Sequence, residues 1–142
     1  SFNILEKAIA CVCNVTHRGA VSADAKTGDG AGITGQLPLK LFRREISRMG
    51  QRLDADGDLA VGMVFLPGHD AEGYRQARSI INDAVLQRGL HLFGWREVPL
   101  DQTALGDIAR TSQPAIEQLI LGRGTGISDV EFSRTLYLIR KA

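Results

Sequence analysis

Apolar residues recur at helical spacing in some stretches of the chain and alternate or run continuously in others. The two patterns predict helices over residues 4–16, 39–49, 71–88 and from 128 onward, and strands over 32–37, 59–66, 90–98 and 116–121. The run Leu59–Leu66 contains no polar side chain, which predicts a strand covered on both faces. Residues 99–114 have little periodicity beyond one candidate turn of helix at 104–109, so we expect a surface loop there. The interleaved order favours an α/β or α+β protein, and periodicity alone does not choose between them.

Polar and glycine residues predict where several of these elements begin and end. Asn3 and Glu6 have the spacing of a capping box at the start of the first helix, and Ser128 and Glu131 repeat that spacing at the start of the last. Other predicted boundaries and irregularities are the N-cap Asp70, the C′ residue Gly89 and a bulge at Gly94.

Composition limits the class of protein. The chain has 142 residues, of which 44% are hydrophobic, and its formal net charge is +1. We therefore expect one domain, residues 1–142, with a core of its own. The balanced charge and the absence of a long apolar run predict no nucleic-acid partner and no membrane partner. The start of the chain lacks the basic and apolar regions of a signal peptide, so we expect a cytoplasmic protein.

Cys11 and Cys13 lie within the first predicted helix. A metal site is one interpretation, because Cys13 and His17 are four residues apart. No second pair of ligands follows, so we favour two small buried apolar residues and predict no metal site. A disulfide between the two is not expected, since residues i and i+2 point to different faces of a helix.

A glycine-rich stretch over residues 16–32, THRGAVSADAKTGDGAG, separates the first helix from the next predicted strand. Residues 27–32 offer unhindered backbone N–H groups that could cradle a phosphate, although Asp29 would repel an anion and no helix follows. Alternatively, the guanidinium of Arg18 recognises a carboxylate or an amide. A third interpretation is that Arg18 only binds carbonyls of its own loop. The glycines permit positive φ and close packing.

The same stretch resembles a known family. Residues 14–20, NVTHRGA, and 24–33, DAKTGDGAGI, are similar to the opening of the glutamine amidotransferase domain of the glutamate synthase large subunit. The His-Arg-Gly element resembles class II glutamine amidotransferases more widely. Residues 62–67, 94–99 and 136–141 resemble that domain in the same order, so the resemblance covers essentially the whole chain.

The resemblance implies an α+β fold, a partial N-terminal-nucleophile hydrolase α/β/β/α sandwich with antiparallel sheets. In that family an N-terminal cysteine attacks the glutamine amide, and its own α-amino group is the base. The released ammonia travels inside the protein to 2-oxoglutarate, giving glutamate. FMN and an iron–sulfur cluster belong to the full enzyme, and none is expected in this chain.

Departures from the family pattern imply an internal fragment. The nucleophilic cysteine would lie upstream of Ser1, and Cys11 and Cys13 cannot replace it because neither has a free α-amino group. We therefore expect no catalytic residue here, inactivity in isolation, and the remainder of the parent enzyme as partner. A sheet that lacks the nucleophile's strand would keep an exposed edge, which predicts self-association. The alternative is a non-catalytic regulatory or interaction module that retains the amidotransferase fold.

The residues carried over from the family are substrate-binding ones. Arg18, His17 and Gly19 match the motif that lines the glutamine site, which binds glutamine and its product glutamate. Asp29 and Gly30 are expected to shape the loop beside that site.

Overall fold

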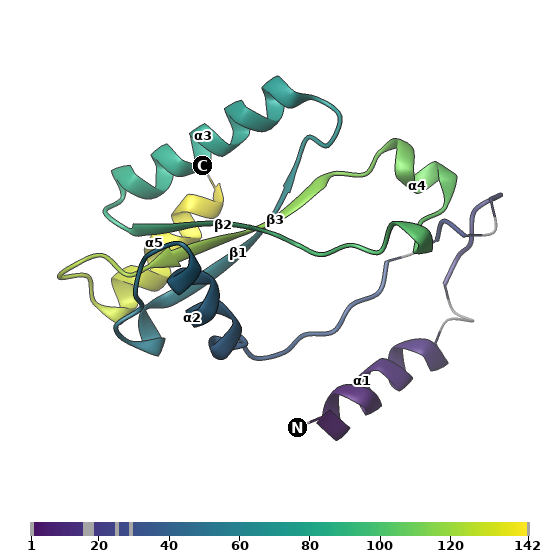
Figure 1. Cartoon of the computed structure of the whole chain (residues 1–142), viewed down its shortest axis with the longest axis horizontal. Helices are drawn as coiled ribbons and strands as arrows, with labels where there is room; N and C mark the ends of the chain where they lie inside the picture. The colour runs from purple at the N-terminus through teal and green to yellow at the C-terminus, as the bar shows by residue number, and fades with distance from the viewer. Residues whose placement is uncertain (1, 16–18, 25, 29, 142) are drawn as a thin grey trace. The chain divides into compact units, whose positions relative to one another are not determined.

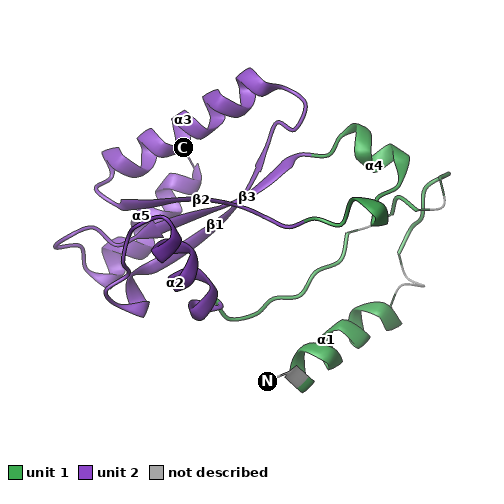
Figure 2. Ribbon diagram, in the orientation of Figure 1, with its two compact units in different colours: residues 1–37, 100–113 green, residues 38–99, 114–142 purple. Residues whose placement is uncertain are grey.

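The computed structural model describes residues 2–15, 19–24, 26–28 and 30–141. The chain divides into two compact units, residues 1–37 with 100–113 (unit 1) and residues 38–99 with 114–142 (unit 2), coloured separately in Figure 2. The assignment of residues 1–142 to a single domain stays a prediction. The elements in chain order are α1 (Phe2–Asn14), α2 (Leu39–Arg48), η2 (Asp56–Asp58), β1 (Leu59–Leu66), α3 (Ala71–Gln87), β2 (His91–Glu97), η3 (Gln102–Ala104), α4 (Asp107–Thr111), β3 (Ala115–Gly122) and α5 (Asp129–Lys141) (Figure 1).

Unit 2 is built on a sheet in which β3 lies between β1 and β2. Both pairings are antiparallel, so Leu59 and His91 each lie opposite Gly122 on the two sides of β3. The described residues thus form an antiparallel sheet with helices, which confirms the expected α+β class.

The two faces of this sheet carry separate cores. On one face Phe42 and Ile46 of α2 pack against the sheet around Ile120. On the other face, α3 and α5 pack against Leu119 and Leu121 (Figure 1). Because successive strand residues point to opposite faces, the run 119–121 supplies both cores from one strand.

The prediction that β1 is covered on both faces is wrong. Met63 and Phe65 are 52% and 65% exposed, although Leu59 and Leu66 at the two ends of the strand are buried. Met63 and Phe65 share the α2 face with Leu59, and the short helix α2 reaches only Leu59 and Val61 among the β1 residues of that core. An apolar run indicates a strand, but it does not indicate how far a neighbouring helix extends.

Several predicted boundaries are confirmed. The Asp70 carboxylate accepts hydrogen bonds from two backbone N–H groups of the first turn of α3, and Gly89 after its end has φ +70°. At the start of α5, the Glu131 N–H donates to Ser128 Oγ while the Ser128 N–H donates to Glu131 Oε2, as a capping box requires. Gly94 lies at a register shift in β2 with φ +149°, which confirms the bulge.

Two other predictions are wrong. Residues 32–37 have no regular structure, and no described strand pairs with them, so alternation alone was insufficient. Helix α1 begins at Phe2, so Asn3 lies inside it rather than at its N-cap. The loop expected over residues 99–114 contains η3 and α4, and α4 overlaps the candidate turn of helix at 104–109. No helix in the described part of the chain is long and apolar enough to cross a membrane.

A polar cluster joins α3 to the sheet. Glu117 of β3 is buried and accepts a hydrogen bond from the Tyr74 hydroxyl, and Arg78 lies 3.7 Å from its other carboxylate oxygen. The Arg78 guanidinium also lies 4.7 Å from the centre of the Trp95 ring, whose N–H donates to Asn82. The hydrogen bond to Glu117, with burial, raises the pKa of Tyr74 above its usual value. These contacts fix the position of α3 along β3.

The core of unit 2 yields a test of its architecture. Ile120 is fully buried on the central strand, so Ile120→Ala should lower the free energy of unfolding by about 2–5 kcal/mol through the cavity it leaves. The control is Ile80, which is 55% exposed on α3. Ile80→Ala should change the free energy of unfolding by less than about 1 kcal/mol. Trp95 is the one tryptophan of the sequence, so its fluorescence in urea reports on this unit. Equal effects of the two substitutions would contradict the assignment of Ile120 to the core.

Candidate functional site

Residues 21–24 and 26–28 of the glycine-rich stretch form a tight turn within unit 1. Val21 pairs with Gly28 in an isolated antiparallel bridge, and the Ser22 N–H donates to the Thr27 carbonyl over 2.6 Å. A Cβ atom on Gly28 would lie 2.6 Å from the Ala20 carbonyl oxygen. Glycine is therefore required at position 28 by the close approach of the two arms.

Asp24 organises the interior of this turn. Its Oδ1 accepts hydrogen bonds from the N–H groups of Thr27 and Lys26, at 2.7 and 3.1 Å, and its Oδ2 accepts one from the Thr27 hydroxyl at 2.5 Å. The hydroxyl of Thr27, followed by these N–H groups, holds the pKa of Asp24 well below its usual range. Asp24 is thus ionised at neutral and mildly acidic pH.

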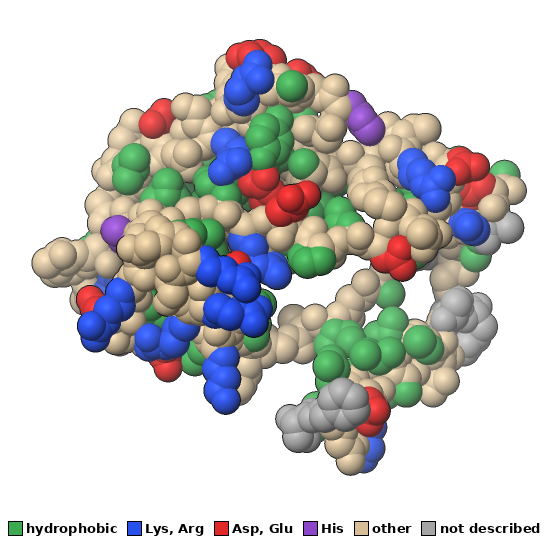
Figure 3. Space-filling view, viewed as in Figure 1, with side chains coloured by type: hydrophobic (Ala, Val, Ile, Leu, Met, Phe, Trp, Pro, Cys, Tyr) green, Lys and Arg blue, Asp and Glu red, His purple; other side chains and the backbone are tan. Residues whose placement is uncertain are grey.

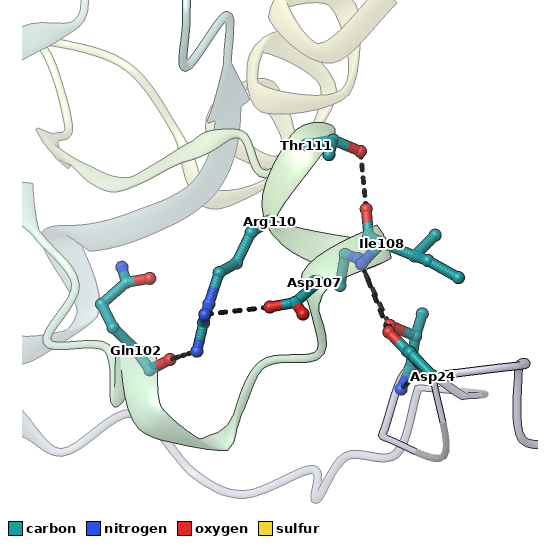
Figure 4. Close-up of polar contacts among 8 residues, drawn as sticks. Asp24, Gln102, Asp107, Ile108, Arg110 and Thr111 are labelled. Atoms are coloured by element: carbon teal, nitrogen blue, oxygen red, sulfur yellow. Dashed lines mark hydrogen bonds and ion pairs between the residues drawn. The ribbon is translucent and has the colours of Figure 1, made fainter.

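The same two side chains reach the start of α4, which is distant in sequence. The Ile108 N–H donates to Asp24 Oδ2 over 3.2 Å, as Figure 4 shows. The Ala109 N–H donates to Thr27 Oγ1 over 3.3 Å. The N-cap residue of α4 is Gly106, which has no side chain to accept these bonds. Asp24 and Thr27 therefore supply the cap that α4 lacks.

Hydrogen bonds among its own residues also hold segment 100–113 together. Arg110 donates to the Asp107 carboxylate over 3.2 Å and to the Gln102 carbonyl over 3.1 Å, as Figure 4 shows. Asp101 accepts from the Thr103 N–H and hydroxyl, which caps η3 and lowers the pKa of Asp101. The segment is therefore an ordered partner for the turn.

A cavity of about 800 Å³ lies within unit 1. Its lining includes Val12 of α1, Val15 just after that helix, Gly19 and Gly30 from the glycine-rich stretch, and Leu105 and Gly106 from the segment before α4. The lining side chains are mostly small and apolar, and Lys26 is the cation among them. Such a space suits a small ligand recognised mainly by backbone groups and by a few polar side chains.

The structure places two of the five predicted substrate-binding residues. Gly19 and Gly30 both line the cavity, and their role in substrate binding stays a prediction. His17, Arg18 and Asp29 lie outside the described residues, and their roles stay predictions. Gly28, Gly30 and Gly32 do not use the positive φ that glycine permits.

The expected burial of Cys11 and Cys13 is also wrong. Both are exposed on α1, and neither forms a disulfide. Ile4 and Leu5 on the same helix are exposed too, and hydrophobic side chains gather over α1 in Figure 3. In the part of the chain that the structure describes, no group of three His, Cys, Asp or Glu side chains could hold a metal ion.

A second glycine-rich loop, residues 123–126, follows β3 in unit 2. Arg123 lines a smaller cavity of about 370 Å³, but its guanidinium pairs with Asp58 at 2.9 Å and with Asp129, and donates to the Gly57 carbonyl at 3.2 Å. A Cβ atom on Gly124 would collide with the Gly89 carbonyl. The loop is thus a packed clamp around Arg123.

Sequence reasoning did not identify Asp24, Thr27 and Gly106 as residues that shape the site. The Asp-x-x-Thr spacing is a local signal, because it predicts an Asx-type turn. No local pattern could show that α4 completes the arrangement, since it follows more than 80 positions later.

Comparison with known proteins identifies the family. The sequence model described as "Glutamine amidotransferases class-II" matches residues 1–142. The chain therefore belongs to the class II glutamine amidotransferases, which are N-terminal-nucleophile hydrolases. The antiparallel sheet and its helices agree with part of the sandwich expected for that family.

Within this family, the chain is similar to glutamate synthases. The chain is 42% identical over 139 residues to the large chain of an NADPH glutamate synthase from Azospirillum brasilense, covering 98% of this chain and 9% of that protein. It is 34% identical over 140 residues to the corresponding large chain from Bacillus subtilis, and 33% identical over 138 residues to a ferredoxin-dependent glutamate synthase from Pyropia yezoensis. These matches cover 98% and 97% of this chain respectively, and 9% of each relative. The chain is thus homologous to a small part of glutamate synthases.

The low pKa of Asp24 predicts how the contact with α4 depends on pH. A carboxyl group whose pKa is lower in the folded state stabilises that state fully above the unfolded pKa of about 3.9, and the effect shrinks as pH falls further. The hydrogen-exchange protection of Ile108 and Ala109 should therefore be lower in Asp24→Asn than in wild type at pH 6. The difference should be smaller at pH 3.

Asp101→Asn is the matched control, because Asp101 accepts the same kind of bonds but only within its own turn. This substitution should leave the protection of Ile108 unchanged. A difference between wild type and Asp24→Asn that is constant across the pH range would contradict the role of the carboxylate.

Proposed function

We propose that the chain forms part of the glutaminase domain of a glutamate synthase, which hydrolyses glutamine and channels the ammonia to 2-oxoglutarate. Membership of the class II amidotransferases and the similarity to glutamate synthases support this function. The observation that carries it is the cavity in unit 1, because Gly19, Thr27, Gly28 and Gly30, which belong to the motif of the resemblance, line it. The chain would supply one wall of the glutamine site.

Within this wall we assign a binding role to Arg18. Its planar guanidinium donates two parallel hydrogen bonds to a carboxylate, which suits the α-carboxylate of glutamine or glutamate. Steadying the strand of the nucleophile is the alternative role for the same group. His17 and Gly19 flank Arg18, and Gly30 places backbone beside the ligand without a side chain in the way.

FMN and an iron–sulfur cluster are assigned to the remainder of the parent enzyme. Clusters of this kind take four protein ligands, mostly cysteine thiolates. The chain contains two cysteines, both exposed on α1 and two residues apart. The residues present therefore do not fit such a cluster by themselves, and we derive no step through it.

The chemistry of the nucleophile predicts that the 142-residue chain is inactive alone. Cys11 and Cys13 lie inside α1, so the nitrogen of each is a peptide nitrogen and cannot act as a base. Purified chain incubated with glutamine should release no more ammonia than the Arg18→Ala chain, as measured by a coupled ammonia assay. Turnover above that control would contradict the inactivity.

A non-catalytic interaction module is the second candidate. The observation in its favour is apolar surface without cover among the described residues, at Ile4 and Leu5 of α1 and at Met63 and Phe65 of β1. In the first function, the remainder of the parent enzyme covers this surface. The intact mass of the natural gene product separates the two, because the relatives are about ten times longer than this chain.

The edge of the sheet predicts self-association of the isolated chain. β1 is an edge strand in the sheet of the described residues, and its eight residues include no charged side chain. Such an edge pairs readily with another chain. Sedimentation velocity should show association that increases with concentration and is weakened by Phe65→Lys.

Tyr137→Lys is the control, because Tyr137 is an exposed aromatic residue on α5, away from the edge. This substitution should leave association unchanged. A chain that stays monomeric at high concentration would count against the edge as an interface.

A further inference from the structure

The turn over residues 21–28 and helix α4 are joined by polar side chains of the turn. Asp24 and Thr27 accept the N–H groups of residues 108 and 109, the second and third positions of α4. These are the donors that an N-cap side chain normally satisfies. The cap therefore comes from a segment that precedes α4 by more than 80 residues.

Gly106 is the part of this arrangement that makes room for the two side chains. A Cβ atom there would collide with Thr27 Oγ1 and with Asp24 Oδ2, and would lie 2.7 Å from the Thr27 nitrogen. Its φ of −73° is open to any residue, so the backbone conformation does not demand glycine. Glycine is required at position 106 because the turn approaches so closely. A serine or aspartate at 106 would be the ordinary local cap, and it would exclude the turn.

The contact lies in the lining of the unit 1 cavity. Thr27 and Gly106 both line it, as do Gly19 and Gly30 of the predicted glutamine site. The Val21–Gly28 bridge ties the two arms of the turn together, so a shift of Thr27 displaces both arms. The position of the wall therefore depends on the contact with α4.

We propose that Asp24 and Thr27, seated against Gly106, form a latch that holds the glycine-rich wall at the geometry needed to bind glutamine. The latch residues are positioning residues, because they act through the wall. This inference rests on the proposed function. The polar contacts with α4 set the affinity for glutamine, because the hydrogen bonds within the turn are not sufficient to hold the wall in place.

Three substitutions open the latch in different ways. Asp24→Asn keeps an oxygen for the turn but cannot present acceptors at both positions, so either the turn or the Ile108 N–H loses its partner. Thr27→Val removes the hydroxyl that accepts from Ala109, and Thr27→Ser restores it. Gly106→Ala changes no polar group and wedges the two segments apart.

Two substitutions are matched controls. Asp101→Asn weakens a cap of the same chemistry that stays within its own turn. Gly35→Ala adds a methyl group in the same unit, where nothing lies within 4 Å of the new atom. Neither residue lines the cavity.

The experiment uses the full glutamate synthase that carries this chain. Each latch-opening variant should raise the KM for glutamine roughly tenfold with kcat little changed, because misplacement of a binding wall weakens substrate binding. Thr27→Ser and both controls should keep the wild-type KM. Glutamate formation from external ammonia bypasses the glutamine site and should stay at the wild-type rate in every variant.

The outcomes separate the two levels of inference. Unchanged KM in Gly106→Ala and Asp24→Asn, with hydrogen exchange showing that the α4 amides have lost protection, would overturn the latch and leave the proposed function intact. Equal losses in the rates of glutamate formation from glutamine and from external ammonia would overturn the latch as well, because they indicate general unfolding. A wild-type enzyme without glutamine-dependent activity would overturn the proposed function, and the positioning role with it.

Discussion

Pairing of β3 on both sides is the constraint on which unit 2 depends. The backbone of β3 pairs with both β1 and β2. Side chains of residues 119–121 of β3 lie in the core under α2 and in the core under α3 and α5. Glu117 of the same strand holds α3 through Tyr74 and Arg78. One strand thus supplies the hydrogen bonds, both apolar cores and the polar contact that sets the position of a helix.

Unit 1 is stabilised differently. Its described residues contain an isolated bridge in place of a sheet, and the apolar residues Ile4 and Leu5 of α1 are exposed. The turn that contains Asp24 and Thr27 is held to itself and to α4 by the Asp24 carboxylate and the Thr27 hydroxyl. A site built in this way is set by a few directional bonds, so it responds to small changes in those groups more than a packed core would.

The sequence predicted the parts of the fold that local chemistry determines. Asp70, Gly89 and the Ser128–Glu131 pair each act within a few residues of their own position, so their spacing was sufficient. Gly19 and Gly30 of the family motif line the cavity of unit 1, and their role in binding stays a prediction. Exposure of Phe65 and the irregular course of residues 32–37 depend on which segments are available to pack against them, and no local pattern records that.

Inclusion of segment 100–113 in unit 1 has a consequence for the order of folding. The Asp24–Ile108 contact closes a loop of 84 residues in an unfolded chain. Once residues 38–99 are folded, the flexible chain between the two partners shortens to the pieces on either side of unit 2. The entropic cost of closing a loop grows with the logarithm of its length, so prior folding of unit 2 lowers this cost by on the order of 1 kcal/mol. The glycine-rich wall therefore assembles more readily after the sheet than before it, and a defect in β3 would slow its formation without touching any residue in it.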